Sequence, residues 1–128
     1  FVGIRDPFSD NAAETFAGIK LKSGFVSTSG SYEKQFESDG VRYHHIFNTS
    51  TGYPVDNELI SVSIVCNNGM LSDMLSTACF ALGTEKSIPL LEKNDADAVF
   101  VTKNKKIIIT SGLKNFISVK EDFEVEYR

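Results

Sequence analysis

The sequence contains no apolar run long enough to span a membrane, no low-complexity segment and no cluster of basic residues. Its 13 lysines and arginines are scattered, and the formal net charge is −4. A protein that binds nucleic acid or an anionic membrane through charge carries a basic patch, so the composition argues against both partners. Because the 128 residues show no repeat and no linker, they indicate a single domain with its own hydrophobic core.

Cysteine is also scarce. The two cysteines, Cys66 and Cys79, lie in apolar surroundings, and their spacing is not the C-x-x-C spacing of a metal site. We expect buried free thiols without a chemical role, with a disulfide between them left open. The chain begins at Phe1 inside a stretch that already looks like a strand, so we expect a fragment that begins within a longer protein.

Residues 68–83 predict the helix around which the rest of the chain is organised. The segment is apolar almost all round, which predicts a buried helix, and Gly83 ends it. The apolar positions are Met70, Leu71, Met74, Leu75, Ala78, Cys79, Phe80, Ala81 and Leu82. One narrow stripe is polar, and it consists of Ser72, Asp73, Ser76 and Thr77.

Asp73 and Thr77 are four residues apart, so their oxygens project side by side from successive turns. A carboxylate beside a hydroxyl is half of a site for a hard cation such as Mg²⁺. The structural alternative is that Asp73 caps or pairs with a neighbouring loop while the hydroxyls bond back to the helix. For an isolated D-x-x-x-T pattern this alternative is the commoner outcome.

Residues 32–37 and 41–47 predict a β-hairpin closed by Asp39-Gly40, a strong two-residue turn signal. Pairing outward from this turn places Glu37 opposite Arg42 and Phe36 opposite Tyr43. The same register predicts that His45, and not His44, faces the apolar side.

The other segments complete an α+β fold, a mostly antiparallel sheet with helices packed on one face. Strands are predicted at residues 1–6, 19–27, 59–66, 96–102, 106–110 and 123–127, and a second helix at residues 84–93. Residues 28–31 predict a turn, residues 48–58 an irregular loop, and residues 111–116 a turn or short helix. Residues 11–16 fit either a helical turn or an exposed loop.

Three further polar groups could carry chemistry. His45, at a strand end before a hydroxyl-rich loop, suits a general base, although an inward histidine is more often structural. The small turn Ser29-Gly30, followed by Tyr32, Glu33 and Lys34, could bring backbone N–H groups close to an anion. Thr110-Ser111-Gly112 is a weaker candidate of the same kind. Turns of this composition are usually only turns.

Three stretches in order, SGSYEKQF, RYHHIFNTSTGYPV and LSDMLSTACFALG, resemble the ApbE family of FAD:protein FMN transferases. That family shows an S-G-x-Y-E-R-like stretch, an H-I-x-D-P-x-T-G-x-P loop and a D-A-x-S-T-A-x-F-x-L-G helix. The resemblance runs from Val2 to about Val101 and covers only the C-terminal part of such a protein. It implies an ApbE-like, T-fold-like C-terminal portion, with the N-terminal half of the family absent.

The resemblance implies a Mg²⁺-dependent reaction in which FAD is the substrate. FMN is transferred to a Thr or Ser hydroxyl of a flavin-acceptor protein, and AMP leaves. By resemblance, Asp73 and Thr77 are metal ligands and His45 is the base for the acceptor hydroxyl. The positions that fall in flavin-lining stretches are Ser29, Gly30, Tyr32, Thr51 and Gly52.

The chain departs from the family pattern at a few positions. Asn48-Thr49-Ser50 stands where D-P-R is usual, which predicts altered flavin contacts or a looser loop. Ser31 replaces a frequent Asp, and Lys34 replaces a frequent Arg, which keeps the charge but loses the bidentate fork. The chain alone is expected to be inactive, with its metal site incomplete.

Two other functions remain open at this stage: an FAD-binding or FAD-sequestering relative without transfer activity, and a small α+β interaction domain. Because family members generally work outside the cytoplasmic membrane, the resemblance also implies an extracytoplasmic parent protein, lipid-anchored to a membrane.

Overall fold

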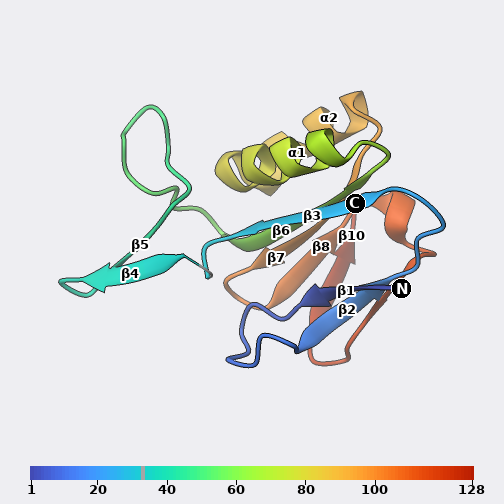
Figure 1. Ribbon diagram of the computed structural model, residues 1–128, viewed down its shortest axis with the longest axis horizontal. Coiled ribbons are helices and arrows are strands. Elements are labelled where there is room, and N and C mark those ends of the chain that lie inside the picture. The colour runs from blue at the N-terminus through green and yellow to red at the C-terminus, as the bar shows by residue number, and fades with distance from the viewer. Residues whose placement is uncertain (33) are drawn as a thin grey trace.

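The structure is a computed structural model that describes residues 1–32 and 34–128. Glu33, one member of the predicted polar turn, lies outside the described residues. The predicted α+β class is confirmed, with two helices on one face of a mostly antiparallel sheet (Figure 1).

A five-stranded sheet in the order β10-β8-β7-β6-β3 forms the centre of the structure. Its strands are β3 (Phe25–Gly30), β6 (Leu59–Cys66), β7 (Asp97–Thr102), β8 (Lys106–Ile109) and β10 (Glu124–Tyr127). Neighbouring strands are antiparallel except for β10 and β8, which run parallel. β6, β7 and β8 are rich in valine and isoleucine, whose branched side chains favour extended backbone.

The two faces of this sheet are covered by different layers. Helices α1 (Gly69–Leu82) and α2 (Thr84–Lys93) cover one face, and a second sheet of β1 (Val2–Arg5), β2 (Thr15–Ile19) and β9 (Ile117–Val119) covers the other (Figure 1). Side chains along β7 point alternately to the two faces. Ala98 and Phe100 pack in the core between the central sheet and the helices, whereas Val99 and Val101 pack in the core between the two sheets. The second sheet was not predicted.

A separate hairpin projects from one end of the central sheet (Figure 1). It consists of β4 (Gln35–Ser38) and β5 (Val41–His44). The predicted register is confirmed, with Glu37 opposite Arg42 and Phe36 opposite Tyr43. The two turn residues have φ values of 52° and 75°, the paired positive values that an Asp-Gly turn favours.

Two predictions for the N-terminal third were wrong. Residues 19–27 are not one strand, because β2 ends at Ile19 and β3 begins at Phe25, with Gly24 between them at a φ of 109°. Residues 28–30 are not a turn but the end of β3, since they pair with β6 as far as Gly30 opposite Ser61. The pairing partner, and not the small side chains, decides their conformation.

Helix α1 has the predicted bounds but not the predicted burial. The Asn68 side chain accepts a hydrogen bond from the Leu71 N–H at 3.0 Å and caps the helix, and Gly83 ends it with a φ of 80°. The prediction of burial all round was wrong, because Met70 is 73% exposed and Met74 62% exposed. The helix packs on the sheet with one face only, and within the described residues no further layer lies over the other.

The second helix and the 96–110 hairpin also match their predictions. Residues 111–113 form a 3₁₀ turn, η1 (Ser111–Leu113), within the segment predicted as a turn or short helix. Cys66 and Cys79 are both buried free thiols, as predicted. Burial raises the pKa of the Cys79 thiol, which keeps it protonated and unreactive.

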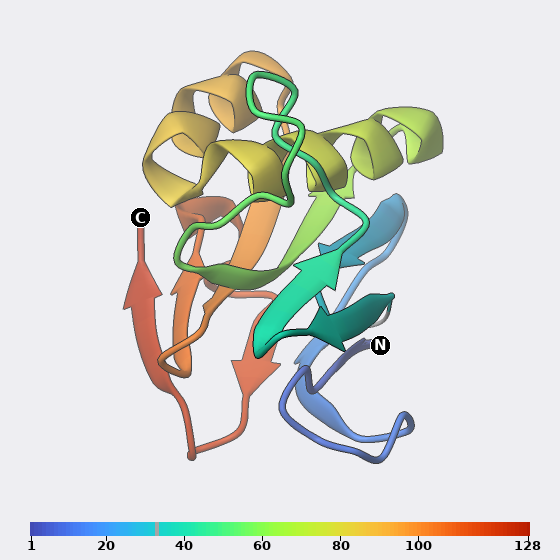
Figure 2. The same ribbon diagram turned by 90° about the vertical axis from the view of Figure 1, so that its left-hand side faces the viewer.

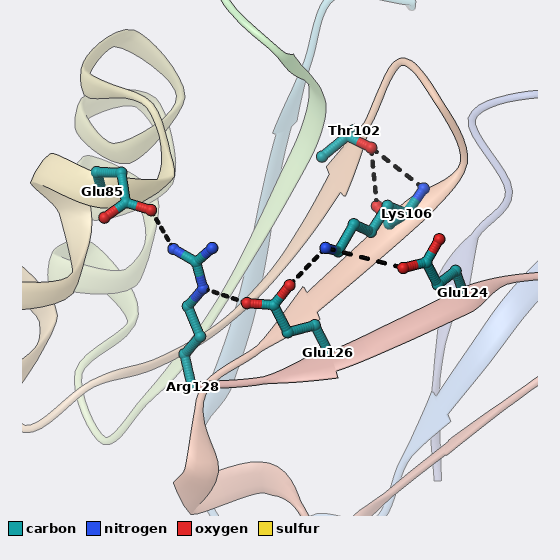
Figure 3. A network of polar contacts seen from close by, with 6 residues as sticks. All are labelled: Glu85, Thr102, Lys106, Glu124, Glu126 and Arg128. Carbon is teal, nitrogen blue, oxygen red and sulfur yellow. Dashed lines mark hydrogen bonds and ion pairs between the residues drawn. The ribbon is translucent and has the colours of Figure 1, made fainter.

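The parallel edge strand β10 is held by a network of charged side chains (Figure 3). The Glu126 carboxylate pairs with Lys106 of β8 at 2.5 Å and with Arg128 at 2.6 Å. Arg128 also pairs with Glu85 of α2, so the network joins the edge strand to the helical layer. Hydrogen bonds from Lys106 and Arg128 lower the pKa of Glu126 to about 2.

This depressed pKa predicts a loss of stability in acid. Because the folded pKa of Glu126 lies below its ordinary value of 4.5, its contribution is complete above that value and is lost as the pH falls toward 2. We expect the urea concentration at the unfolding midpoint to fall less between pH 6 and pH 3 for Glu126→Gln than for the unmodified chain. Glu121→Gln serves as the control, because it changes an exposed carboxylate that makes no hydrogen bond or ion pair within the described residues. Equal losses in all three proteins would contradict the assignment.

Candidate functional site

Hydroxyl groups connect helix α1 to the edge strand β3. Ser27 bonds to Ser72 at 2.7 Å, and Ser29 bonds to Ser76 at 2.7 Å and to Thr77 at 3.2 Å. Ser72 and Ser76 are fully buried in this contact, so half of the predicted polar stripe is packing between helix and sheet. The alternative of hydroxyls bonding back to the helix holds for this half, since Ser72 donates to the Gly69 carbonyl and Ser76 to the Asp73 carbonyl.

The direction of these hydrogen bonds follows from the number of hydrogens. A hydroxyl has one hydrogen, and Ser76 gives its own to the Asp73 carbonyl at 2.8 Å. Ser29 must then donate to Ser76, so the Thr77 hydroxyl is the donor in its bond to Ser29. Thr77 Oγ1 therefore keeps its lone pairs for another partner, which is the state a metal-ligating hydroxyl needs.

Asp73 lies one turn before Thr77 on the outer side of this contact. The prediction of a buried carboxylate was wrong, because both side chains are exposed. The Asp73 carboxylate makes no hydrogen bond or ion pair with any residue in the described part of the chain, so it does not cap or pair with a loop there. An exposed, unengaged carboxylate next to free hydroxyl lone pairs can accept a cation without losing an existing partner.

Gly30 and Tyr32 form one unit at the end of β3. A Cβ on Gly30 would lie 2.4 Å from the Tyr32 ring and 3.1 Å from the Ile60 carbonyl oxygen, so the ring packs directly on the glycine backbone. The Arg5 guanidinium also lies over this ring, at 5.1 Å from its centroid. Glycine is required here for this close approach, which places Tyr32 at the edge of a cleft.

The orientation predicted for the two histidines was wrong. His44 is half-buried and His45 is exposed. The hairpin register itself was right, but the hairpin projects away from the sheet, so its aromatic face is not the core face (Figure 1). Strand β5 ends at His44, and it is His44 and Ile46 that reach the core of the domain. His45 stands at the bend between them with its side chain open to solvent.

Residues 48–54 form a loop closed by Asn48. Its side-chain oxygen accepts from the Ser50 N–H at 2.9 Å, its N–H donates to the Tyr53 carbonyl at 2.8 Å, and its carbonyl accepts from the Gly52 N–H at 2.8 Å. Asn48, at the position where the family resemblance placed an Asp, therefore makes the turn contacts with its amide oxygen. Thr51 and Gly52 lie exposed at the tip of this turn.

The loop of residues 45–58 is fixed to the helical layer at its far end (Figure 2). Asn57 donates to the Phe80 carbonyl at 2.7 Å, and the Glu58 carboxylate accepts from the Thr84 N–H at 2.9 Å, where it caps α2. Partial burial raises the pKa of Glu58, but the hydrogen bonds from Thr84 and from its own backbone outweigh burial and lower it overall.

A cleft of about 970 Å³ opens between the hairpin, this loop and the N-terminal turn. Aromatic and cationic groups line it together, a combination that suits a nucleotide with its flat rings and phosphates. The aromatic members are Phe8, Tyr32, Tyr43 and Tyr53, and the cationic ones are Arg5, Arg42 and Lys103. Lys103 is paired with Asp56 at 2.9 Å, and this hydrogen bond lowers the pKa of Asp56.

The remaining candidate, Thr110-Ser111-Gly112, is not an anion site. The Thr110 hydroxyl donates to the Asp97 carboxylate at 2.5 Å, and a Cβ on Gly112 would lie 2.4 Å from the same carboxylate. Because a carboxylate already occupies the turn, a second anion is excluded by repulsion.

The structure thus brings Ser29, Asp73 and Thr77 together at the β3–α1 contact and places Gly30 and Tyr32 beside the cleft. His45, Thr51 and Gly52 belong to the neighbouring loop, and among the described residues they make no hydrogen bond with that group. The sequence interpretation missed the roles of His44 and Asn48. Asn48 could have been found from its position before Ser50, since Asn commonly bonds to the backbone two residues on.

Within the described residues, no His, Cys, Asp or Glu cluster of three or more could hold a metal, and no helix is long and apolar enough to cross a membrane. The site therefore offers one carboxylate and one hydroxyl, in an α+β domain with an open nucleotide-sized cleft. An open pair of this kind differs from a closed structural metal site, in which the protein supplies all the ligands.

Comparison with known proteins identifies the family. The ApbE family model matches residues 1–100. The FAD:protein FMN transferase of Klebsiella pneumoniae (strain 342) is 42% identical over 111 residues, 86% of this chain and 35% of that protein. The FAD:protein FMN transferase of Treponema pallidum (strain Nichols) is 41% identical over 119 residues, 92% of this chain and 33% of that protein.

A solved structure agrees with these relatives. The crystal structure of the ApbE protein from Thermotoga maritima superposes with a TM-score of 0.76 at 37% identity, covering 90% of this chain and 37% of that one. The chain therefore belongs to the ApbE family. It spans about a third of the length of the curated relatives named above.

Proposed function

We propose that this chain is the C-terminal part of a Mg²⁺-dependent FAD:protein FMN transferase. The observation that carries the proposal is the exposed Asp73–Thr77 pair, with its carboxylate unengaged and its hydroxyl oriented by Ser29. Membership of the ApbE family and the family order of the three motifs support it. The two curated relatives named above bear the name of that activity.

The donor set fits Mg²⁺. This ion prefers oxygen ligands, keeps several waters and is commonly bound by one or two carboxylates together with substrate phosphates. Asp73 would supply the carboxylate and Thr77 the hydroxyl, and a backbone carbonyl from the N-terminal part of the protein completes the protein ligands. When bound, the ion supplies charge neutralisation at the phosphate groups of FAD.

The proposed reaction is a phosphoryl transfer. The acceptor hydroxyl oxygen forms a bond to the phosphorus of the FMN portion, the bond to the bridging pyrophosphate oxygen breaks, and AMP leaves with that oxygen. His45 takes the hydroxyl proton. Its exposure supports this role, because a base for a protein substrate must be reached from outside, and its place at a bend leaves the imidazole open to solvent.

Flavin binding is assigned to the cleft and its surroundings. Tyr32 lines the cleft directly. Thr51 and Gly52 do not line it, but they are exposed and lie next to Tyr53, which does. Ser29 and Gly30 act on flavin binding through other residues, because Ser29 orients Thr77 and Gly30 leaves space for the Tyr32 ring.

The proposal includes the domain organisation and the location of the protein. Residues 1–128 form one C-terminal domain, the N-terminal half of the family site lies outside this chain, and the 128 residues are inactive alone. The complete protein works outside the cytoplasmic membrane as a lipid-anchored enzyme.

A second candidate is an FAD-binding or FAD-sequestering protein without transfer activity. The observation that favours it is Asn48-Thr49-Ser50, which replaces a usual D-P-R and removes a carboxylate from the loop. The well-formed turn around Asn48 weighs against loss of the loop itself. A third candidate, a small α+β interaction domain, is favoured only by the exposed apolar side chains of the hairpin and α1.

The deciding experiment incubates the complete protein with FAD, Mg²⁺ and a flavin-acceptor domain and measures the mass of the acceptor. An acceptor heavier by one FMN group supports the transferase. Tight FAD binding without an adduct would support the sequestering protein, and absence of both FAD and Mg²⁺ binding would support the interaction domain.

His45→Gln tests the base in the same assay. Glutamine keeps the size and hydrogen bonding of the side chain but cannot take a proton at neutral pH, so we expect acceptor modification to fall about 10²–10⁴-fold. FAD affinity should change less than about threefold, because the exposed imidazole touches nothing that forms the cleft. An equal loss of FAD affinity would make His45 a binding residue instead.

A further inference from the structure

His44 contacts three parts of the domain at once. Its Nε2 lies 2.8 Å from the Val55 carbonyl oxygen, and its Nδ1 accepts a hydrogen bond from the Ile46 N–H at 3.2 Å. The ring also meets Phe80 of α1 edge to face, with 5.7 Å between centroids. One side chain therefore joins the end of the hairpin, both ends of the 46–55 turn and the helix.

These contacts select one tautomer of the imidazole. A carbonyl oxygen only accepts, so Nε2 carries a hydrogen, and Nδ1 accepts from an N–H, so it carries none. The neutral Nε2–H form is therefore the one that holds both partners. A proton added to Nδ1 would place an N–H donor opposite the Ile46 N–H donor, and this hydrogen bond would be lost.

The Ile46 contact spans His45. The hydrogen bond from the Ile46 N–H to the His44 ring bridges the one residue between them, His45. This bridge accounts for the bend at His45, whose side chain is exposed. The Val55 contact holds the far side of the turn whose tip carries Thr51 and Gly52.

We infer that His44 is a positioning residue, which in its neutral form holds His45 and the 48–54 turn in place against α1. The inference rests on the proposed function for its effect on catalysis but not for its effect on structure. The charged groups that face the ring are Asp56, whose carboxylate attracts the imidazolium, and Lys103, which is paired with Asp56. From the other packed elements it meets the neutral Gln35 and Phe80.

The structural test uses amide hydrogen exchange and imidazole ¹⁵N shifts in the 128-residue chain. We expect the Nε2–H tautomer at neutral pH, with exchange at Ile46 rising at least about fivefold in His44→Ala. His44→Asn is the matched variant, because its side-chain oxygen can still accept from the Ile46 N–H, and should restore protection there. Unchanged exchange at Ile46 in His44→Ala, or a neutral Nδ1–H tautomer, would overturn the inference.

The functional test uses the complete protein. In His44→Ala we expect the rate of acceptor modification at saturating FAD to fall about tenfold and FAD affinity to weaken, because His44 lines the cleft and holds the turn that carries Thr51 and Gly52. His44→Asn should recover part of both. If even the unmodified protein forms no adduct, the proposed function fails while the exchange measurements still decide the role of His44. A rate unaffected by His44→Ala, with an intact adduct assay, would refute the positioning role.

Discussion

Asp73→Asn is expected to reduce Mg²⁺-dependent FMN transfer by the complete protein at least about 100-fold. The substitution keeps the shape of the side chain but removes the only carboxylate of the pair, and a neutral amide oxygen is a much weaker ligand for Mg²⁺. Because Asp73 is exposed and engages no described partner, the free energy of unfolding should change by less than about 0.5 kcal/mol.

Glu92→Gln is the matched control for this prediction. It also removes one exposed carboxylate from a helix, but from α2, away from the Asp73–Thr77 pair. We expect its transfer rate and its Mg²⁺ dependence to equal those of the unmodified protein. Full activity of Asp73→Asn would remove Asp73 from the site, and loss of activity in both variants would point to net charge instead of a metal ligand.

Phe100→Ala should destabilise the chain by about 3–5 kcal/mol. Phe100 is fully buried at the middle of β7 and packs in the core between the central sheet and the two helices. Truncation leaves a cavity in this core, and a domain of this size has a total stability of only about 5–15 kcal/mol. Urea unfolding followed by circular dichroism measures the change.

Phe1→Ala is the control for Phe100→Ala, since Phe1 is 89% exposed and its truncation should cost less than about 0.5 kcal/mol. A change below about 1 kcal/mol for Phe100→Ala would contradict the position of β7 between two buried layers.

The local elements could be predicted where local signals are strong. Asp39-Gly40 fixed the hairpin and its register, because both residues tolerate the positive φ that the turn requires. The β-branched run gave β6 its bounds, and Gly83 gave α1 its end. Residues 28–30 could not be assigned this way, since their small side chains have no strong preference and pairing with β6 decides their conformation.

Burial was harder to predict than secondary structure. The apolar positions of α1 gave no sign that Met70 and Met74 would face outward, because hydrophobicity does not say which side of a helix receives a neighbour. The same holds for the hairpin. Its register was predicted correctly, but His45 was predicted to face the core, whereas His44 is the half-buried histidine. The alternation of a strand gives two faces, and only packing against α1 selects one of them.

By itself, the sequence determined the residue types and spacings of the candidate site, the order of the three motifs, and the hairpin and helix next to which two of them lie. Those follow from covalent spacing and local conformational preference, which act within a few residues. The tertiary structure alone decided that Ser29 bonds to Thr77, that Asp73 stays exposed and that His44 contacts Val55 and Phe80. These properties depend on contacts between segments up to 48 residues apart, which form only when the chain folds.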